Sequence, residues 1–205
     1  MILMIEGARH VGKTHLMEAF FAQNTDPRVQ YYKFQFSKYL SYLGLEDQET
    51  GPGIHYFSIA NVLTIFELNN TVFKDKVLVF DRSIFSAYVW SMYRRRMHEG
   101  RLMEEFEAIL SNYDLFHDVS VLHITRSATL HNSDRDKSHD YFDNFENPEI
   151  ESSYFRKVYN RMEKYMISDT RNTSLTHLNN NFDQESVNRF NATMNNIVNR
   201  VPVLG

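Results

Sequence analysis

The sequence lacks cysteine altogether, which excludes disulfide bonds and thiolate metal sites and fits a reducing compartment. It also lacks a hydrophobic run long enough to span a membrane, and the apolar start before Glu6 is too short for a signal peptide. We therefore expect a cytoplasmic protein with no membrane partner. The net charge of −4 excludes a general attraction to nucleic acid or anionic lipid, so any nucleic-acid contact would need a local basic patch.

Glycine and proline are scarce, at seven and four residues, and no internal repeat divides the chain. Aromatic residues are abundant by contrast, with 16 phenylalanines and 12 tyrosines. This abundance predicts a core or a pocket rich in aromatic rings. The length of 205 residues is sufficient for one domain with a full hydrophobic core.

The strongest motif lies near the N-terminus, where Gly7 to Thr14 read G-x-x-x-x-G-K-T. This is the pattern of the phosphate-binding loop of nucleoside triphosphate enzymes. Gly7 and Gly12 permit backbone conformations in which successive amide groups point at a phosphate. We expect Lys13 to reach the β- and γ-phosphates and the Thr14 hydroxyl to ligate Mg²⁺. The residues expected to bind the nucleotide here are Gly7, Ala8, Arg9, His10, Val11, Gly12, Lys13, Thr14 and His15.

The residues around this motif fit a strand, a loop and a helix in succession. Met1 to Ile5 form a continuous apolar run, as is typical of a buried parallel strand. After the motif, apolar residues recur at helical spacing through Phe21, so the positive end of a helix adds to phosphate binding. We expect the side chains of His10 and His15 to pack locally or to face solvent.

Strand and helix patterns alternate along the rest of the chain. This alternation predicts an α/β P-loop fold over residues 1–205, with a parallel sheet of about five strands, helices on both faces and a lid at about residues 126–147. After the first strand, strands are expected at residues 29–36, 76–83, 119–125 and 174–178. Helices are expected at residues 58–68, 86–98, 102–111, 151–167 and 184–198, and residues 37–45 form a short amphipathic stretch.

Asp81 and Arg82 form a second candidate group, because they close an apolar strand in a chain that has a phosphate loop. Ligands of such sheets bind at the carboxyl ends of the strands, where both Gly7 and Asp81 are expected. An acid in this place helps to hold Mg²⁺ or its water, or it orients or deprotonates an acceptor hydroxyl. The alternative is an acid that caps the next helix. Arg82 is either a ligand of an acceptor phosphate or a partner of Asp81.

The polar stretch from Arg126 to Lys137 is a candidate lid. Phosphoryl transfer gathers charge on the equatorial phosphate oxygens, and cations on a closing segment stabilise that charge. Arg126, Arg135 and Lys137 are the cations available in this stretch, and the alternative is a solvated loop of mixed charge.

Arg94 to Arg96 together with Arg101 form a further basic group. Three adjacent arginines cannot share one helix face, so at most two of them can point at a site. A solvated helix face is the favoured interpretation of this group, and contact with phosphate or the DNA backbone is the minority one.

These motifs together resemble the nucleoside and nucleotide kinases grouped with thymidylate kinase. The resemblance rests on Gly7 to Thr14 and on Asp81 to Tyr88, whose start D-R-S-I-F-S is also similar to E-R-S-x-x-S of deoxynucleoside kinases. The stretch from Arg126 to Tyr159 is similar to the lid of that family and the helix after it. Residues 181–187 look like the segment whose backbone packs on the adenine of ATP, which implies a nucleotide contact at Asp183.

The chain departs from this family on the acceptor side. Residues 33–37 read K-F-Q-F-S, with neither the Arg-Glu-Pro-like motif of thymidylate kinases nor the catalytic Glu of deoxynucleoside kinases. The helical arginine that grips the acceptor phosphate is also missing from residues 59–68. Lys33, Arg82 or one of the arginines at 94–96 would have to substitute. Otherwise the acceptor is a hydroxyl without a nearby phosphate, as in a nucleoside or a modified base within DNA.

We therefore expect a kinase that transfers the γ-phosphoryl group of ATP, with Mg²⁺, to a deoxynucleotide-type acceptor. A deoxynucleoside, or 5-hydroxymethyluracil within phage DNA, is the alternative acceptor, and the sequence allows a homodimer. A nucleotide-switched binding module is a distant alternative, because the base-reading N-K-x-D motif of GTPases does not occur. The residues expected to act in catalysis are Lys13, Asp81, Arg82, Arg126 and Arg135, and those expected to hold the metal are Thr14 and Asp81.

Overall fold

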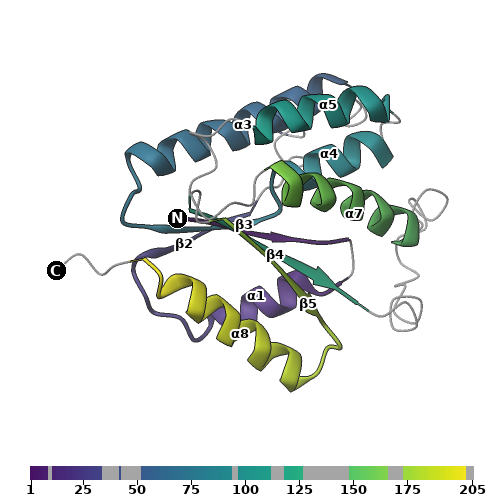
Figure 1. The fold of residues 1–205 in the computed structure, drawn as a ribbon. Helices are drawn as coiled ribbons and strands as arrows, with labels where there is room; N and C mark the ends of the chain where they lie inside the picture. Colours follow the sequence, from purple (N-terminus) through teal and green to yellow (C-terminus); the bar gives the residue numbers. More distant parts are fainter. Residues whose placement is uncertain are drawn as a thin grey trace.

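The computed structural model is an α/β fold in which a five-stranded parallel sheet lies between two layers of helices (Figure 1). It describes residues 1–8, 11–33, 42, 52–93, 97–111, 118–126, 148–165 and 173–201. The strands are β1 (Ile2–Glu6), β2 (Val29–Lys33), β3 (Val77–Asp81), β4 (Val119–Thr125) and β5 (Ser174–Asn179). The helices are α1 (Lys13–Phe21), α3 (Pro52–Thr71), α4 (Ile84–Tyr93), α5 (Glu99–Leu110), α7 (Pro148–Tyr165) and α8 (Gln184–Val198). The predicted fold class is confirmed.

The strands lie in the order β2-β3-β1-β4-β5, and every neighbouring pair is parallel. In the central strand β1, Met4 pairs with Phe80 on one side and with Val121 on the other. β1 and β3 are buried along their whole length, which explains why both are continuous apolar runs. Because all strands run the same way, their carboxyl ends meet at one edge of the sheet, where the loop after β1 and Asp81 both lie.

Helices α3, α4, α5 and α7 cover one face of the sheet, and α1 and α8 cover the other (Figure 1). Aromatic rings fill both layers, as the composition predicts. Phe66 of α3 lies edge-on to Phe80 of β3, and Phe20 of α1 lies edge-on to Phe190 of α8. All four rings are almost fully buried, so they join the helices to the sheet on both of its faces.

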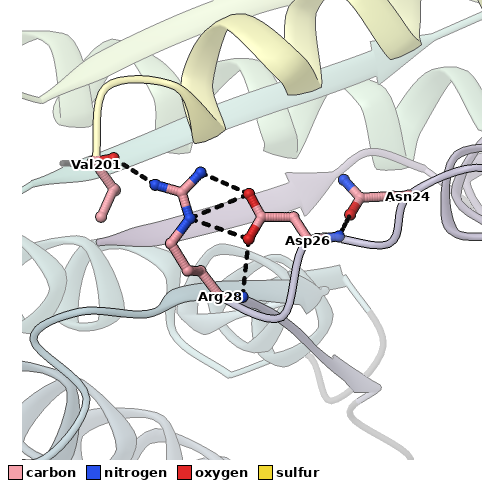
Figure 2. Close-up of polar contacts among 4 residues, drawn as sticks. All are labelled: Asn24, Asp26, Arg28 and Val201. Atoms are coloured by element: carbon pink, nitrogen blue, oxygen red, sulfur yellow. Dashed lines mark hydrogen bonds and ion pairs between the residues drawn. The ribbon is translucent and has the colours of Figure 1, made fainter. Parts of the chain in front are cut away.

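A polar contact at the opposite, amino-terminal edge of the sheet joins the start of β2 to the chain that follows α8 (Figure 2). The guanidinium of Arg28 donates to both carboxylate oxygens of Asp26 and, at 2.6 Å, to the carbonyl oxygen of Val201. Hydrogen bonds from Arg28 lower the pKa of Asp26 below its usual range, so the pair is charged at neutral pH. The contact fixes the edge strand β2 at the end away from the site.

The element boundaries differ from the sequence prediction mainly in α3, which begins at Pro52 rather than at residue 58. Proline suits the first position of a helix, because its missing N–H would have no partner there. The helices predicted at 86–98 and 102–111 are α4 and α5, which begin two and three residues earlier than expected, at Ile84 and Glu99.

Several predictions fall where the structure gives no description. Residues 34–36 of the predicted second strand, the amphipathic stretch 37–45 except Tyr42, and the lid beyond Arg126 lie outside the described residues. Among the helices that are described, none combines the length and the apolar character needed to cross a bilayer.

Replacing Phe66 by Ala tests the packing of α3 on the sheet. The ring is fully buried against Phe80, so we expect the free energy of unfolding to fall by about 3–5 kcal/mol. Urea unfolding followed by far-UV circular dichroism measures the change. The matched control is Leu68→Ala on the same helix, whose side chain is 39% exposed and whose loss should change the stability by about 0.5 kcal/mol or less. Equal losses in the two variants would show that α3 does not pack as described.

Candidate functional site

The phosphate-binding loop takes the shape that its two glycines allow. Gly7 has a φ of 143° and Gly12 a φ of 83°, both in the region that favours glycine. A Cβ at Gly7 would overlap with the carbonyl oxygen of Ile124 in the neighbouring strand. A Cβ at Gly12, which precedes the first residue of α1, would overlap with Asn180 and the ring of Phe182. Both positions therefore require glycine for space as well as for conformation.

Asn180 holds the loop in place from the end of β5. Its side-chain amide is fully buried and donates a hydrogen bond of 2.8 Å to the carbonyl oxygen of Val11. Its side-chain oxygen accepts from the backbone N–H of Phe182 at 2.9 Å, and its own N–H donates to the carbonyl of Thr125 at 2.8 Å. One buried residue thus joins the phosphate loop to the ends of β4 and β5.

Lys13 is buried and donates to two carbonyl oxygens of its own loop, those of Gly7 at 2.8 Å and Ala8 at 2.7 Å. Burial and, to a lesser extent, the nearby charge of Arg82 lower the pKa of this ammonium group to about 7. Asp81, Glu151 and Glu6 act in the opposite direction. A nucleotide phosphate would add negative charge beside Lys13 and would favour its protonated form.

Asp81 closes β3 and is 5% exposed. Its Oδ2 accepts a hydrogen bond from the Tyr31 hydroxyl at 3.3 Å, and burial together with this carboxylate raises the pKa of Tyr31, so the phenol remains a donor. Its Oδ1 is buried and accepts no hydrogen bond from any residue that the structure describes. Such an oxygen suits a metal ion or a metal-bound water, so Asp81 fits the Mg²⁺ role expected of it.

The other expected metal ligand is Thr14, which lies in the exposed first turn of α1. Across the described part of the chain, no three His, Asp or Glu side chains gather in the way that a metal site built from protein alone would need. A magnesium ion held by Thr14 and Asp81 would therefore take its remaining ligands from phosphate and water, as is usual for this ion.

Arg82 has a backbone conformation that is rare for a residue with a side chain, with a φ of 74°. Its N–H donates to the carbonyl oxygen of Ile5 at 3.0 Å, so the turn after β3 is tied to β1. Its guanidinium lies over the indole of Trp90, 4.6 Å from the ring centroid. The two interactions hold the cation close to Lys13 and Asp81.

Glu6, the last residue of β1, is fully buried beside this turn. Each of its carboxylate oxygens accepts one hydrogen bond of 2.5 Å, Oε1 from the Ser83 hydroxyl and Oε2 from the Ser86 hydroxyl. Burial raises the pKa of Glu6, while the two hydroxyls and the charges of Arg82 and Lys13 act to lower it. The sequence analysis assigned no role to Glu6, although an acid that ends an apolar strand at the ligand-binding edge is itself a signal.

An aromatic platform, made of Phe182 and His15, lies against the outer side of the loop. Phe182 is 42% exposed and has a φ of 61°, and the His15 ring lies nearly parallel to it at 6.0 Å. The guanidinium of Arg126 lies 4.2 Å from the centroid of the Phe182 ring. Arg126 and His15 both contact Phe182 beside the loop, and their expected roles in catalysis and nucleotide binding stay predictions, whereas Phe182 was not singled out from the sequence.

Asp183 acts as the N-cap of α8, where its side chain accepts a hydrogen bond of 2.7 Å from the Ser186 N–H. This bond lowers the pKa of the carboxyl. The expected contact of this residue with a nucleotide stays a prediction. Tyr88 of α4 is fully buried and donates to Glu105, so it belongs to the core. The expected site residues that lie outside the described part of the chain are Arg9, His10, Arg94, Arg95, Arg96, Arg135 and Lys137.

Comparisons with known proteins bear on the fold. No protein-family model matches the sequence, and no curated protein matches it at a significant level. Among solved structures, a deoxyadenosine kinase from M. mycoides with bound dCTP is similar, with a TM-score of 0.58 and 10% sequence identity. The match covers 98% of this chain and 100% of the kinase chain. The chain thus shares the fold of this kinase, and at this identity the likeness concerns the fold alone.

The pKa of Lys13 leads to a prediction about the pH dependence of nucleotide binding. Phosphate favours the protonated lysine, so ATP affinity should fall by up to about tenfold per pH unit above about 7, with proton uptake on binding. Calorimetry in two buffers of different ionisation enthalpy measures this uptake. In the control Lys13→Arg, the guanidinium stays charged, so only the ionisation of ATP itself contributes to the pH dependence of binding. The same pH dependence in both proteins would contradict the assignment.

Proposed function

We propose that the protein is an ATP-dependent phosphotransferase with Mg²⁺ as cofactor and a deoxynucleoside as its preferred acceptor. The observation that carries this proposal is the placement of a phosphate loop with Lys13 and Thr14 beside Asp81 and Arg82 at one edge of the sheet. A nucleotide-switched module also combines the loop with an acid at a strand end, so Asp81 alone does not favour transfer over binding. Arg82 beside that acid does favour transfer, because a second cation close to Lys13 suits stabilisation of a transferred phosphoryl group.

The chain's own residues would bind and orient the donor. The loop amides and the Lys13 ammonium would hold the β- and γ-phosphates, with Lys13 exchanging its contacts to Gly7 and Ala8 for phosphate oxygens. A magnesium ion held by Thr14 and Asp81 supplies charge neutralisation at these oxygens. The planar guanidinium of Arg126 and the ring of Phe182 would stack on the donor base outside the loop.

The acceptor side favours a hydroxyl that is not already next to a phosphate. An acceptor monophosphate needs charge-assisted hydrogen bonds in a water-poor pocket. Helix α3, which covers the sheet face on this side, contains no Lys or Arg from Pro52 to Thr71. Arg82 remains close to Asp81 and would contact the transferred group. The similar fold of a deoxyadenosine kinase supports the same acceptor class.

A deoxynucleotide acceptor of the thymidylate type is the second candidate. It is favoured by the D-R-S sequence from Asp81 to Ser83 and by the cation–π contact that holds Arg82 at the site. In that case Arg82 would bind the acceptor phosphate rather than the transferred group. The two candidates differ in whether a free monophosphate or only a nucleoside is phosphorylated.

The deciding measurement is ATP consumption with deoxynucleosides, with deoxynucleoside monophosphates, and with DNA that does or does not contain 5-hydroxymethyluracil. We expect turnover with a deoxynucleoside. Turnover with a monophosphate alone would support the thymidylate-type function, and turnover with modified DNA alone would support a DNA-modifying kinase. The absence of acceptor-dependent ATP consumption with all of these compounds would overturn the kinase proposal.

Lys13→Ala should abolish this turnover, with a loss of at least about 100-fold in kcat, because the charge on the transferred phosphoryl group loses its main cation from the chain. The matched control is Lys74→Ala, an exposed lysine at the opposite edge of the sheet, which should leave the rate unchanged. Circular dichroism of both variants checks that the fold is kept. A folded Lys13→Ala protein that retains activity would refute the site.

Asp81→Asn tests the free carboxylate oxygen. If Oδ1 holds the magnesium ion or its water, the variant should need about tenfold more Mg²⁺ for half-maximal rate, because a neutral amide is a weaker ligand. A Mg²⁺ titration of the rate measures this shift. An unchanged Mg²⁺ requirement together with a lower kcat would assign Asp81 to the acceptor hydroxyl instead.

A further inference from the structure

Two serines of the D-R-S-I-F-S stretch have no part in the phosphoryl transfer described above. Ser83 and Ser86 are both almost fully buried, and both hydroxyls donate to Glu6, one to each carboxylate oxygen, at 2.5 Å. We call this group of Glu6, Ser83 and Ser86 the serine–glutamate latch. The two serines lie 77 and 80 positions after Glu6 in the sequence, so only the tertiary fold brings the three residues together.

The latch satisfies a carboxylate in a place where water does not reach. An isolated buried carboxylate is strongly unfavourable, and hydrogen bonds to each oxygen offset that cost. Ser83 immediately precedes α4, so the carboxylate also lies at the positive end of that helix. Both contributions favour one fixed position of the Glu6 side chain.

The latch connects the start of the phosphate loop with the turn that carries Arg82. Glu6 immediately precedes Gly7 of the phosphate loop, and Ser83 immediately follows Arg82. The two hydrogen bonds therefore set the distance between the start of the loop and the turn that carries Arg82. Two further contacts act on the same turn, the bond from the Arg82 N–H to Ile5 and the stacking of its guanidinium on Trp90.

The backbone of Arg82 needs such support. A φ of 74° is unfavourable for a residue with a side chain and persists only where the surroundings hold it. Without the latch, the turn could relax to an ordinary conformation and move the guanidinium away from Lys13 and Asp81. The phosphate loop would keep its own shape, because Gly7, Gly12 and Asn180 determine it.

We propose that Glu6 is a positioning residue of this site, which acts through Ser83 and Ser86 to hold Arg82 against the phosphate loop. The kinetic part of the proposal rests on the proposed kinase function. The structural part does not, because the position of Arg82 is observable without any reaction.

Trp90 makes that position measurable, because it is the single tryptophan of the sequence and lies 4.6 Å from the Arg82 guanidinium. Ser86→Ala, which leaves Glu6 Oε2 without its donor, should shift the tryptophan emission and raise its quenching by iodide. Glu6→Gln keeps the shape of the side chain and part of its hydrogen bonding. It should therefore change the tryptophan emission and the iodide quenching less than Glu6→Ala does.

The matched control is Ser120→Ala, which removes another buried serine hydroxyl, one that is hydrogen-bonded to Ser174 near the opposite edge of the sheet. It should lower the stability without changing the tryptophan signal.

In the kinase assay, Ser86→Ala should lower kcat by about 100-fold and leave the KM for ATP within about twofold, since misplacement of one group by 1 Å has an effect of this size.

The outcomes separate this proposal from the proposed function. An unchanged tryptophan signal in folded Ser86→Ala and Glu6→Ala proteins would overturn the latch even if the protein is a kinase. Equal tryptophan signals in Ser86→Ala and Ser120→Ala would show that the latch contributes only to overall stability. That result would also overturn the proposal. A shifted signal in a protein that phosphorylates no acceptor would support the latch and refute the kinase function alone.

Discussion

Parallel pairing of β1 with both β3 and β4 is the constraint on which the rest of the site depends. It brings three strand ends to one edge of the sheet, so that the phosphate loop after β1 lies between the Asp81–Arg82 turn and Arg126. The pairing is close enough that a side chain at Gly7 would meet the backbone of β4. The continuous apolar character of these strands, buried on both faces, is what allows the arrangement.

The site is a compact group of charges, of which Arg82 is half-buried and the other three are buried. Lys13 and Arg82 are its cations, and Glu6 and Asp81 are the anions beside them. Buried charges are tolerated only when they are paired or hydrogen-bonded, and here each anion has a separate set of partners. Glu6 accepts hydrogen bonds from two serines, whereas Asp81 has one buried oxygen that accepts no hydrogen bond from the described residues, as its proposed metal role requires. Burial is the main cause of the lowered pKa of Lys13, and the proposed binding of a nucleotide phosphate would favour the protonated form.

Fold and function are separate conclusions for this chain. The similarity to a deoxyadenosine kinase at 10% identity extends over almost the whole chain and establishes the architecture. A P-loop fold accommodates several kinds of acceptor, so the acceptor must be argued from the residues around it. The absence of basic residues from α3 is the feature on which the proposed preference for a nucleoside over a monophosphate rests.

The sequence by itself determined the features that depend on neighbouring residues. The phosphate loop, the apolar strands and the order of strands and helices follow from short-range patterns, and so does the acid at the end of β3. Tertiary structure alone decided which distant groups meet. Glu6 with Ser83 and Ser86, Asn180 with Val11, and Phe182 with Gly12 are all contacts between separate segments. No local periodicity encodes such contacts, because they arise only when the sheet has assembled.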